Sequence, residues 1–196
     1  MVNEFYQLIS KSPNPETPDK GWFAEAKQKL LCKGCSSPRV TGKPIDVVLQ
    51  TKPDRSAVNF VHGVSIHIAT NALLQALFPE GPHESLLLGK VLGPDRKQVT
   101  GFVTLMNREC ILVRGNERST FRVCPDCRRV WYSAIGKRYI LKRDVGSTNV
   151  YESQYGGLVV SEDVAKRVIG GKWRNLVVRR LELRDEPVDG LDVPER

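Results

Sequence analysis

The sequence predicts an α+β fold with a mostly antiparallel sheet, a few helices and a zinc-ribbon-like site of four cysteines. Three observations carry this prediction. Two Cys-x-x-Cys pairs occupy positions 32–35 and 124–127. Short apolar segments separated by turn residues fill 86–143, which is typical of an antiparallel meander. Two further segments, 65–78 and 162–169, carry apolar residues at helical spacing.

The N-terminal quarter is expected to hold two strands and one helix. Residues 4–9 predict a short strand, and the proline-rich stretch 12–18 predicts a loop. Residues 22–30 predict a helix before the first cysteine pair, and 44–50 predict a strand after it. The apolar face of that helix would consist of Trp22, Phe23, Ala26 and Leu30.

The clearest helix of the central region is expected at 65–78. Ser65 is its candidate N-cap, and Pro79 follows its end. Its apolar residues fall on one stripe, which consists of Ile66, Ala69, Leu73, Ala76 and Leu77.

The rest of the chain predicts strands and one more helix, at 162–169. Ser161 is the expected N-cap of this helix, acidic residues fill its first turn, and Gly170 with Gly171 ends it. The expected strands are 86–92, 100–106, 110–114, 120–123, 129–135, 138–143, 157–160 and 176–183.

The chain is predicted to form one domain with a charged tail. We expect a single α+β domain over 1–184, in which residues of about 44–108 form an inserted subdomain. Residues 185–196 carry five acids and one base and predict a loose acidic tail. Between 108 and 184, 17 basic residues face 8 acidic ones, and the net charge of the 196-residue chain is +8, which permits contact with a polyanion.

The cysteines Cys32, Cys35, Cys124 and Cys127 are the strongest chemical signal in the sequence. Two intervening residues let both thiolates of a tight turn face one ion, and two such turns complete a tetrahedral sulfur site for Zn²⁺. A closed site of four cysteines is typically structural. A thioredoxin-like redox pair and an iron–sulfur cluster are alternative uses of the same residues.

The two cysteine pairs are separated by 88 residues, from 36 to 123, far more than in usual zinc ribbons. Such an insert must leave and return with its ends close together, so we expect it to be folded rather than a flexible loop. The fifth cysteine, Cys110, stands in an apolar segment and is expected to pack as a small apolar residue.

None of the common enzyme motifs for phosphate, dinucleotide, nucleophile or zinc-protease chemistry occurs in the sequence, so we expect a non-enzymatic protein. His62, His67 and His83 show no metal-binding spacing, and we interpret them as structural or surface residues. The longest apolar runs fall far short of the ~20 residues that span a bilayer, and the first ten residues lack a secretory signal pattern. We therefore expect a cytoplasmic protein without a membrane partner.

The layout resembles the double-CXXCG motif proteins of myxobacteria and their relatives, a group that includes immunity proteins paired with secreted toxins. The resemblance spans about 5–183 and rests on the N-terminal Phe-Tyr strand, a tryptophan before the first cysteine pair, the distant second pair and the run Gly-Leu-Val-Val-Ser-Glu-Asp-Val-Ala at 157–165. The glycine that follows each pair in the family is replaced here by Ser36 and Arg128. The resemblance implies a small soluble bacterial protein that acts by binding, with the four cysteines as zinc ligands.

Three functions remain open at this point. The first is a zinc-stapled protein that binds another protein, such as a cognate toxin, through aromatic anchors drawn from Trp131, Tyr132, Tyr151, Tyr155 and Trp173. The alternative is a nucleic-acid-binding zinc ribbon that uses the basic stretch 128–143 for phosphate contacts and stacking. Its candidate binding residues are Arg128, Arg129, Trp131, Tyr132, Lys137 and Arg138. An unrecognised enzyme or thiol redox protein is the third hypothesis.

Overall fold

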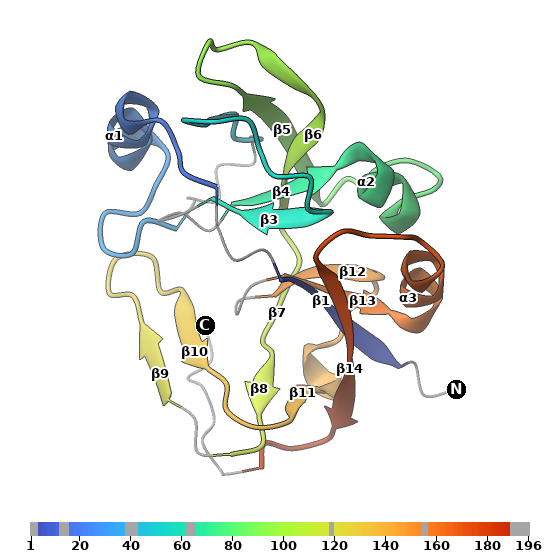
Figure 1. Ribbon diagram of the computed structural model, residues 1–196. Helices are drawn as coiled ribbons and strands as arrows, with labels where there is room; N and C mark the ends of the chain where they lie inside the picture. The colour runs from blue at the N-terminus through green and yellow to red at the C-terminus, as the bar shows by residue number, and fades with distance from the viewer. Residues whose placement is uncertain are drawn as a thin grey trace.

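The computed structural model describes six stretches of the chain, which are residues 4–11, 16–37, 43–61, 66–117, 120–153 and 157–188. The side chains of residues 60, 120, 121 and 131–133 are not among the described parts. Over these stretches the chain forms three α-helices, one 3-10 helix and the strands β1 to β14 (Figure 1). The predicted α+β class is therefore confirmed.

The seven-stranded sheet is built from both ends of the chain. Strand β1 (Phe5–Ser10) lies in its centre, between β13 (Leu158–Ser161) and β14 (Leu176–Arg184). Beyond β13 lie β12 (Val150–Ser153) and β7 (Cys110–Ile111). Beyond β14 lie β11 (Arg138–Leu141) and the edge strand β8 (Arg114–Gly115). The 3-10 helix η1 (Lys142–Asp144) follows β11 in the chain.

The five-stranded sheet is formed by residues between the two cysteine pairs. Its order is β2 (Val47–Val48), β5 (Leu86–Leu92), β6 (Gln98–Asn107), β4 (His67–Thr70) and β3 (Val58–Phe60). Helix α1 (Lys20–Lys29) precedes this sheet in the chain, and α2 (Asn71–Leu77) follows β4. A separate hairpin consists of β9 (Thr120–Val123) and β10 (Val130–Ser133). The division into a domain and an inserted subdomain stays a prediction.

Both large sheets are mixed, so the prediction of a mostly antiparallel sheet is wrong. Parallel pairs join β7 to β12, β11 to β14, and β2 to β5. Turn residues in the sequence indicate hairpins such as β5–β6, which are antiparallel because a short turn reverses the chain. The parallel partners are distant in the sequence, and no local pattern marks them.

The helix predicted at 65–78 begins later than its apolar spacing indicates. Ser65, the expected N-cap, lies outside the described residues, and His67–Thr70 form β4, in which Ile68 pairs with both β3 and β6. Helix α2 covers only Asn71–Leu77. Its N-cap is Thr70, whose Oγ1 accepts a hydrogen bond at 3.2 Å from the backbone N–H three residues later. Strand pairing on both sides of β4 outweighs the helical spacing of its residues.

The other two helices agree closely with prediction. Helix α1 begins at Lys20, two residues before the expected 22–30, because Asp19 Oδ1 accepts a hydrogen bond from Trp22 N at 2.9 Å and caps it. Helix α3 (Glu162–Ile169) has the predicted bounds. Ser161 occupies its N-cap position, but the hydroxyl makes no capping hydrogen bond, so the acidic first turn is what favours this end.

Several strands differ from their predicted bounds. The predicted strand 110–114 is divided between β7 and β8, which lie at opposite edges of the seven-stranded sheet. The predicted strand 138–143 is shorter in the structure, because β11 ends at Leu141 and η1 begins at Lys142. Of 44–50, only Val47–Val48 pair as β2. Strand β12 is absent from the sequence prediction, although all four of its residues are buried.

The two large sheets share one apolar core. Leu8 of β1 and Leu158 of β13 cluster with Leu73 of α2 and Leu105 of β6, and Val164 of α3 belongs to the same cluster. A second core packs α1 against the five-stranded sheet and includes the residue before the first cysteine pair. Across the described ranges, no helix has the length and apolar character that crossing a bilayer requires.

The start of the predicted acidic tail contacts the seven-stranded sheet. Asp185 Oδ1 lies 2.7 Å from Lys142 Nζ, and the Tyr139 hydroxyl accepts a hydrogen bond from Val188 N at 3.1 Å. Residues 185–188 are thus held against the domain, and the rest of the tail lies outside the described residues.

Candidate metal centre

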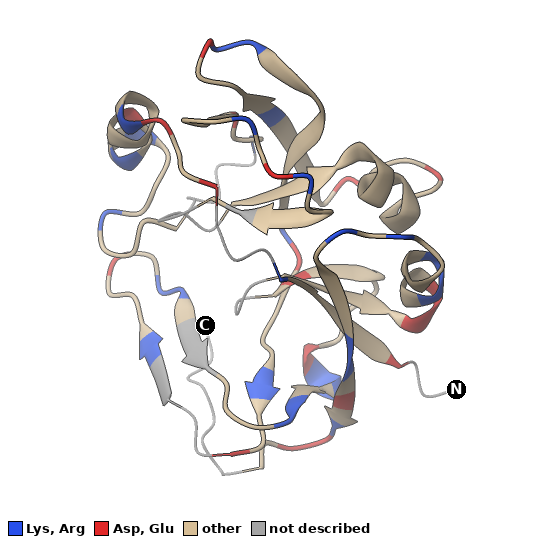
Figure 2. Cartoon of the chain, in the orientation of Figure 1, with Lys and Arg blue, Asp and Glu red and all other residues tan. Residues whose placement is uncertain are grey.

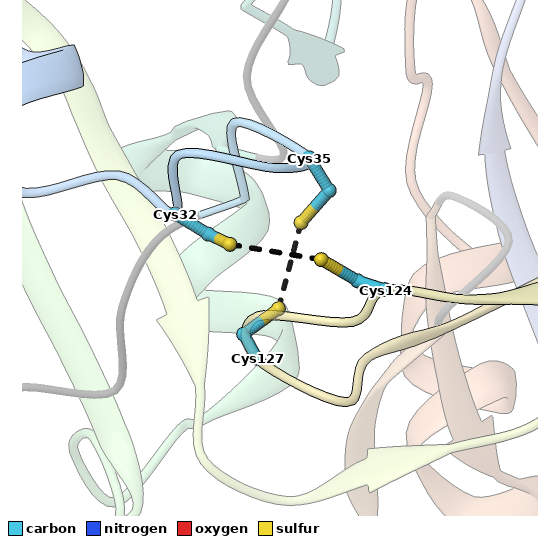
Figure 3. A group of neighbouring side chains, drawn as sticks. All are labelled: Cys32, Cys35, Cys124 and Cys127. Atoms are coloured by element: carbon cyan, nitrogen blue, oxygen red, sulfur yellow. Dashed lines mark hydrogen bonds between the residues drawn. The ribbon is translucent and has the colours of Figure 1, made fainter.

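The four cysteines predicted as metal ligands lie together at one point (Figure 3). Their sulfur atoms are all within 4.8 Å of one another. Cys32 Sγ is 3.7 Å from Cys124 Sγ, and Cys35 Sγ is 3.5 Å from Cys127 Sγ. Two pairs that are 88 residues apart in the sequence therefore form a single cluster.

Each pair lies in a tight backbone turn, and we call residues 32–37 knuckle 1 and residues 124–129 knuckle 2. In both knuckles the N–H of the residue after the second cysteine donates to the carbonyl of the first cysteine, at 2.8 Å in knuckle 1 and 2.9 Å in knuckle 2. The N–H of the first cysteine donates to the carbonyl five residues later, again at 2.8 Å and 2.9 Å. The two turns have matching backbone hydrogen bonds although their residues differ.

The residue after the second cysteine of each knuckle has a left-handed backbone conformation. Its φ is 56° at Ser36 and 62° at Arg128. Glycine adopts this conformation freely, whereas a residue with a Cβ does so at a cost of about 1–2 kcal/mol. The knuckle geometry therefore favours glycine at both positions, where this chain carries Ser36 and Arg128.

The knuckles approach each other closely at Gly34. A Cβ at this position would lie 3.2 Å from Cys124 Sγ and 2.7 Å from Asp126 Oδ2. Contacts this short force the neighbouring atoms to move. The lack of a side chain at Gly34 thus lets knuckle 1 pack directly on a sulfur of knuckle 2.

The cluster has a buried side and a solvent-facing side. Cys32 and Cys124 are 4% and 2% exposed, whereas Cys35 is half-buried and Cys127 is exposed. Burial raises the pKa of the Cys127 thiol, and its contacts with the other thiols raise it further, to about 12. Burial also raises the pKa of Cys35, but interactions with Ser37 and with neighbouring thiols outweigh it and lower this pKa to about 6. A bound cation would favour the thiolate form of all four ligands.

The dimensions of the cluster suit a tetrahedral metal ion. With metal–sulfur bonds of about 2.3 Å, as for zinc, the sulfurs of a tetrahedron are about 3.8 Å apart. Two of the six sulfur–sulfur separations, 3.5 and 3.7 Å, are close to this value, and all six lie within 4.8 Å. They are far from the ~2.05 Å of a disulfide bond. Four sulfur ligands fill a tetrahedral ion completely, as in a structural rather than a catalytic centre.

An ion pair between a partly buried arginine and a buried glutamate anchors knuckle 2 to the rest of the protein. Arg129 Nη2 lies 3.1 Å from Glu152 Oε1, and the two side chains are 17% and 6% exposed. Glu152 belongs to β12, and its Oε2 accepts a hydrogen bond at 3.2 Å from Asn107 N of β6. Through these contacts the pair ties the β9–β10 hairpin to both large sheets.

The pair also affects the nearby His67 imidazole. Burial lowers the pKa of His67, and Arg129 lowers it further, whereas Glu152 opposes this shift.

The residues of the basic stretch 128–143 have different environments. Arg129 points inward to its ion pair, and Arg138 is half-buried, with its guanidinium donating to a backbone carbonyl four residues earlier. Arg128 and Lys137 are exposed. The candidate residues whose side chains lie outside the described parts are Trp131 and Tyr132.

Lys137 and Arg138 line a hollow of about 1160 Å³ that sequence reasoning missed. Arg179 and Arg180 of β14 also line it, because the parallel pairing of β11 with β14 brings them close to the β10–β11 turn. Figure 2 shows basic and acidic residues side by side at this end of β11 and β14. The acidic residues that line the hollow are Glu4, Glu117 and Glu182.

The charges of this hollow are only partly paired. Arg180 forms an ion pair with Glu4. Within the described part of the chain, the side chains of Lys137 and Arg179 make no ion pair. In the sequence, the adjacent Arg179 and Arg180, which follow three apolar residues of β14, are a signal for this site beside the basic pair Lys137 and Arg138.

Most of the predicted aromatic anchors are not available on a described surface. Tyr151 is 1% exposed and serves the core. Trp173 is half-buried and packs against the shared core. Tyr155, like the side chains of Trp131 and Tyr132, lies outside the described parts. The apolar side chain that does face solvent here is Ile135, 46% exposed and two residues from Lys137.

Comparison of the chain with protein-family models finds no matching family, and comparison with curated proteins finds no similar one. The cysteine cluster and the charged hollow are therefore the features from which a function is inferred.

Proposed function

We propose that the protein is a non-enzymatic binding protein whose two knuckles are stapled by one zinc ion. The observation that carries this proposal is the closed set of four sulfurs, all within 4.8 Å of one another. Such a set holds an ion without leaving a position for substrate or water. It joins the turn after α1 to the β9–β10 hairpin, so its role is to fix these two segments in place.

Zinc is the ion that suits these ligands best. Four thiolates in a tetrahedral arrangement select zinc or iron–sulfur chemistry. The sulfur–sulfur separations of 3.5 and 3.7 Å match a single ion, whereas a multi-iron cluster inserts several atoms between its thiolates. Purified protein is expected to contain zinc and to lack the visible absorbance of iron–sulfur centres.

The loop 135–138 supplies the rigid surface that a binding function needs. The Asn116 N–H donates to Lys137 O at 3.0 Å, and the Lys137 N–H donates to Asn116 Oδ1 at 2.7 Å. The Glu117 N–H donates to Ile135 O at 3.3 Å. Because the loop is held before a partner arrives, binding orders little additional chain. Ile135 is exposed, and the side chain of Lys137 makes no ion pair with the part of the chain that the structure describes. Together they offer an apolar anchor and a charge to a protein partner.

The charges of the hollow favour a protein partner over nucleic acid. Four basic residues and three carboxylates line it. Those carboxylates would repel a polyphosphate backbone, whereas a protein surface can present acidic and basic groups in a complementary arrangement. A cognate bacterial toxin, the partner that the family resemblance implies, belongs to this class.

The proposed binding face is tested by the double charge reversal Lys137→Glu with Arg179→Glu. Its matched control, Lys52→Glu with Lys97→Glu, makes the same change of net charge at exposed positions outside the hollow. All proteins are used as bait in a lysate of the native host, and captured proteins are identified by mass spectrometry. We expect a partner that the wild type and the control retain and the Lys137/Arg179 variant loses. Retention by all three, or no partner at all, contradicts the proposed binding face.

Nucleic-acid binding is a second candidate function, favoured by the four basic residues around the hollow. If it is the function, labelled single- or double-stranded oligonucleotides bind the wild-type protein, and the affinity falls steeply with added salt as phosphate contacts are replaced by counterions. The Lys137/Arg179 double reversal then abolishes this binding. Absence of binding at low salt excludes the second candidate.

A further inference from the structure

The cysteine cluster has an asymmetry that a staple alone does not require. Two sulfur pairs, Cys32–Cys124 at 3.7 Å and Cys35–Cys127 at 3.5 Å, each link one knuckle to the other (Figure 3). The inner pair, Cys32 and Cys124, is almost fully buried, whereas the outer pair, Cys35 and Cys127, faces solvent. The shorter separation, 3.5 Å, belongs to the outer pair.

The residues next to the cysteines also make the outer sulfurs more accessible to solvent than the inner ones. Cys127 lies between Asp126 and Arg128, and both of these residues are exposed. Cys32 instead follows Leu31, which has no exposed surface and belongs to the core around α1. A small solute therefore reaches the outer sulfurs before the inner ones.

We propose that Cys35 and Cys127 form an oxidative modification site, at which a hydroperoxide converts the outer sulfur pair into a disulfide that links the two knuckles. This inference rests on the proposed metal site, because these sulfurs are two of its four ligands. The substrate class is a small hydroperoxide that reaches the solvent-facing side of the cluster. The buried pair stays reduced in this first reaction.

The reaction balances with hydrogen peroxide as the oxidant. One outer thiolate attacks a peroxide oxygen and the O–O bond breaks, which forms a sulfenic acid and a hydroxide ion that takes up a proton to become water. The second outer thiolate attacks the sulfenic sulfur, forms the S–S bond and releases a second hydroxide, which is protonated in turn. The two thiolates lose two electrons in total, and the peroxide is reduced to two water molecules.

The disulfide between the knuckles keeps them joined after the site has lost two metal ligands. A disulfide within a knuckle would close a short ring and leave the two segments unlinked. A bond between Cys35 and Cys127 encloses the entire five-stranded sheet, and cross-links that close long loops constrain the unfolded chain most. Oxidation thus exchanges a metal staple for a covalent one.

Peptide mapping of the full chain identifies which cysteines are joined. Metal-loaded protein is treated with hydrogen peroxide, free thiols are alkylated, and the protein is digested with trypsin and Asp-N without reduction. We expect the first disulfide to join the peptides of Cys35 and Cys127, with a mass lower by two hydrogens than the reduced peptides, and metal to be released in step with it. The digestion separates all five cysteines, on peptides 30–33, 34–39, 109–114, 123–125 and 126–128.

A first disulfide within either knuckle, between the buried sulfurs, or to Cys110 overturns the proposal. The matched variant Cys110→Ala keeps all four cluster cysteines and is expected to give the same map and the same metal release as the wild type. The disulfide map of the wild-type protein alone decides the result, so the test does not require a variant of any metal ligand to fold. If the purified protein contains no metal, the proposed zinc staple is refuted before peroxide is added. If the protein contains metal but forms a different first disulfide, only the proposed oxidation site at Cys35 and Cys127 is refuted.

Discussion

Replacing Arg128 with glycine should make the metal-loaded protein more stable. Arg128 has a φ of 62°, in the left-handed region, because knuckle 2 requires this conformation after its second cysteine. Its side chain is exposed, and it makes no hydrogen bond or ion pair with another described side chain. Removal of the side chain therefore relieves backbone strain without breaking a contact that the structure describes.

The expected gain follows from two opposing effects. A left-handed residue with a Cβ costs about 1–2 kcal/mol, and glycine avoids this cost. Glycine also loses more backbone freedom on folding, which offsets roughly 0.5–1 kcal/mol of the gain. We expect a net stabilisation of about 0.5–1 kcal/mol, which for a chain of this length corresponds to a rise in Tm of about 1–4 °C.

Chemical denaturation of the zinc-loaded variants, with Tm as a second readout, measures this effect. Arg128→Ala is the control, because alanine removes the same charge but keeps the Cβ that causes the strain. Ser36→Gly repeats the test in knuckle 1, where φ is 56°. A glycine variant that is no more stable than the alanine variant would refute the assignment of strain to these positions.

Three other substitutions test the surroundings of the cluster. Glu152→Gln removes the buried carboxylate that pairs with the partly buried Arg129 and should lower the free energy of unfolding, measured in urea, by about 3 kcal/mol. Glu25→Gln, in an exposed ion pair of α1, should change it by less than about 1 kcal/mol, and equal effects of the two substitutions would contradict the anchoring role. Burial lowers the pKa of His67 in the folded protein, so on acidification the unfolded chain takes up this proton at a higher pH than the folded protein does. The free energy of unfolding should therefore fall as the pH drops below the ordinary histidine pKa of 6.5, and His67→Gln should remove this contribution to the pH dependence. A variant with the same pH dependence as the wild type would contradict this role of His67. Gly34→Val should weaken metal retention against a competing chelator, because the new Cβ would lie 3.2 Å from the facing sulfur, and unchanged retention would show that the knuckles can separate.

The elements that the sequence predicts well are those specified by local chemistry. Asp and Glu in the first turn and two glycines at the end specify α3, and its predicted bounds agree with the structure. The Cys-x-x-Cys spacing likewise specifies a turn that can present two sulfurs to one ion, so the cluster could be anticipated from the residues alone. Each of these signals lies within a few consecutive residues.

The elements that the sequence does not predict depend on partners far along the chain. His67–Thr70 fits a helical apolar stripe, and only its pairing with β3 and β6 makes it a strand. Arg129 looks like a surface cation until β12 places Glu152 beside it. The hollow exists because β11 pairs in parallel with β14, which brings Arg179 near Lys137. No local pattern encodes such pairings.

Metal content per chain, measured on protein purified without chelator and followed by thermal unfolding before and after chelation, tests the central claim most directly. A staple formed by four sulfurs predicts about one zinc ion per chain and a clear fall in Tm when that ion is removed. A protein that carries no metal, or whose Tm is unchanged by chelation, would contradict the claim that zinc joins the two knuckles.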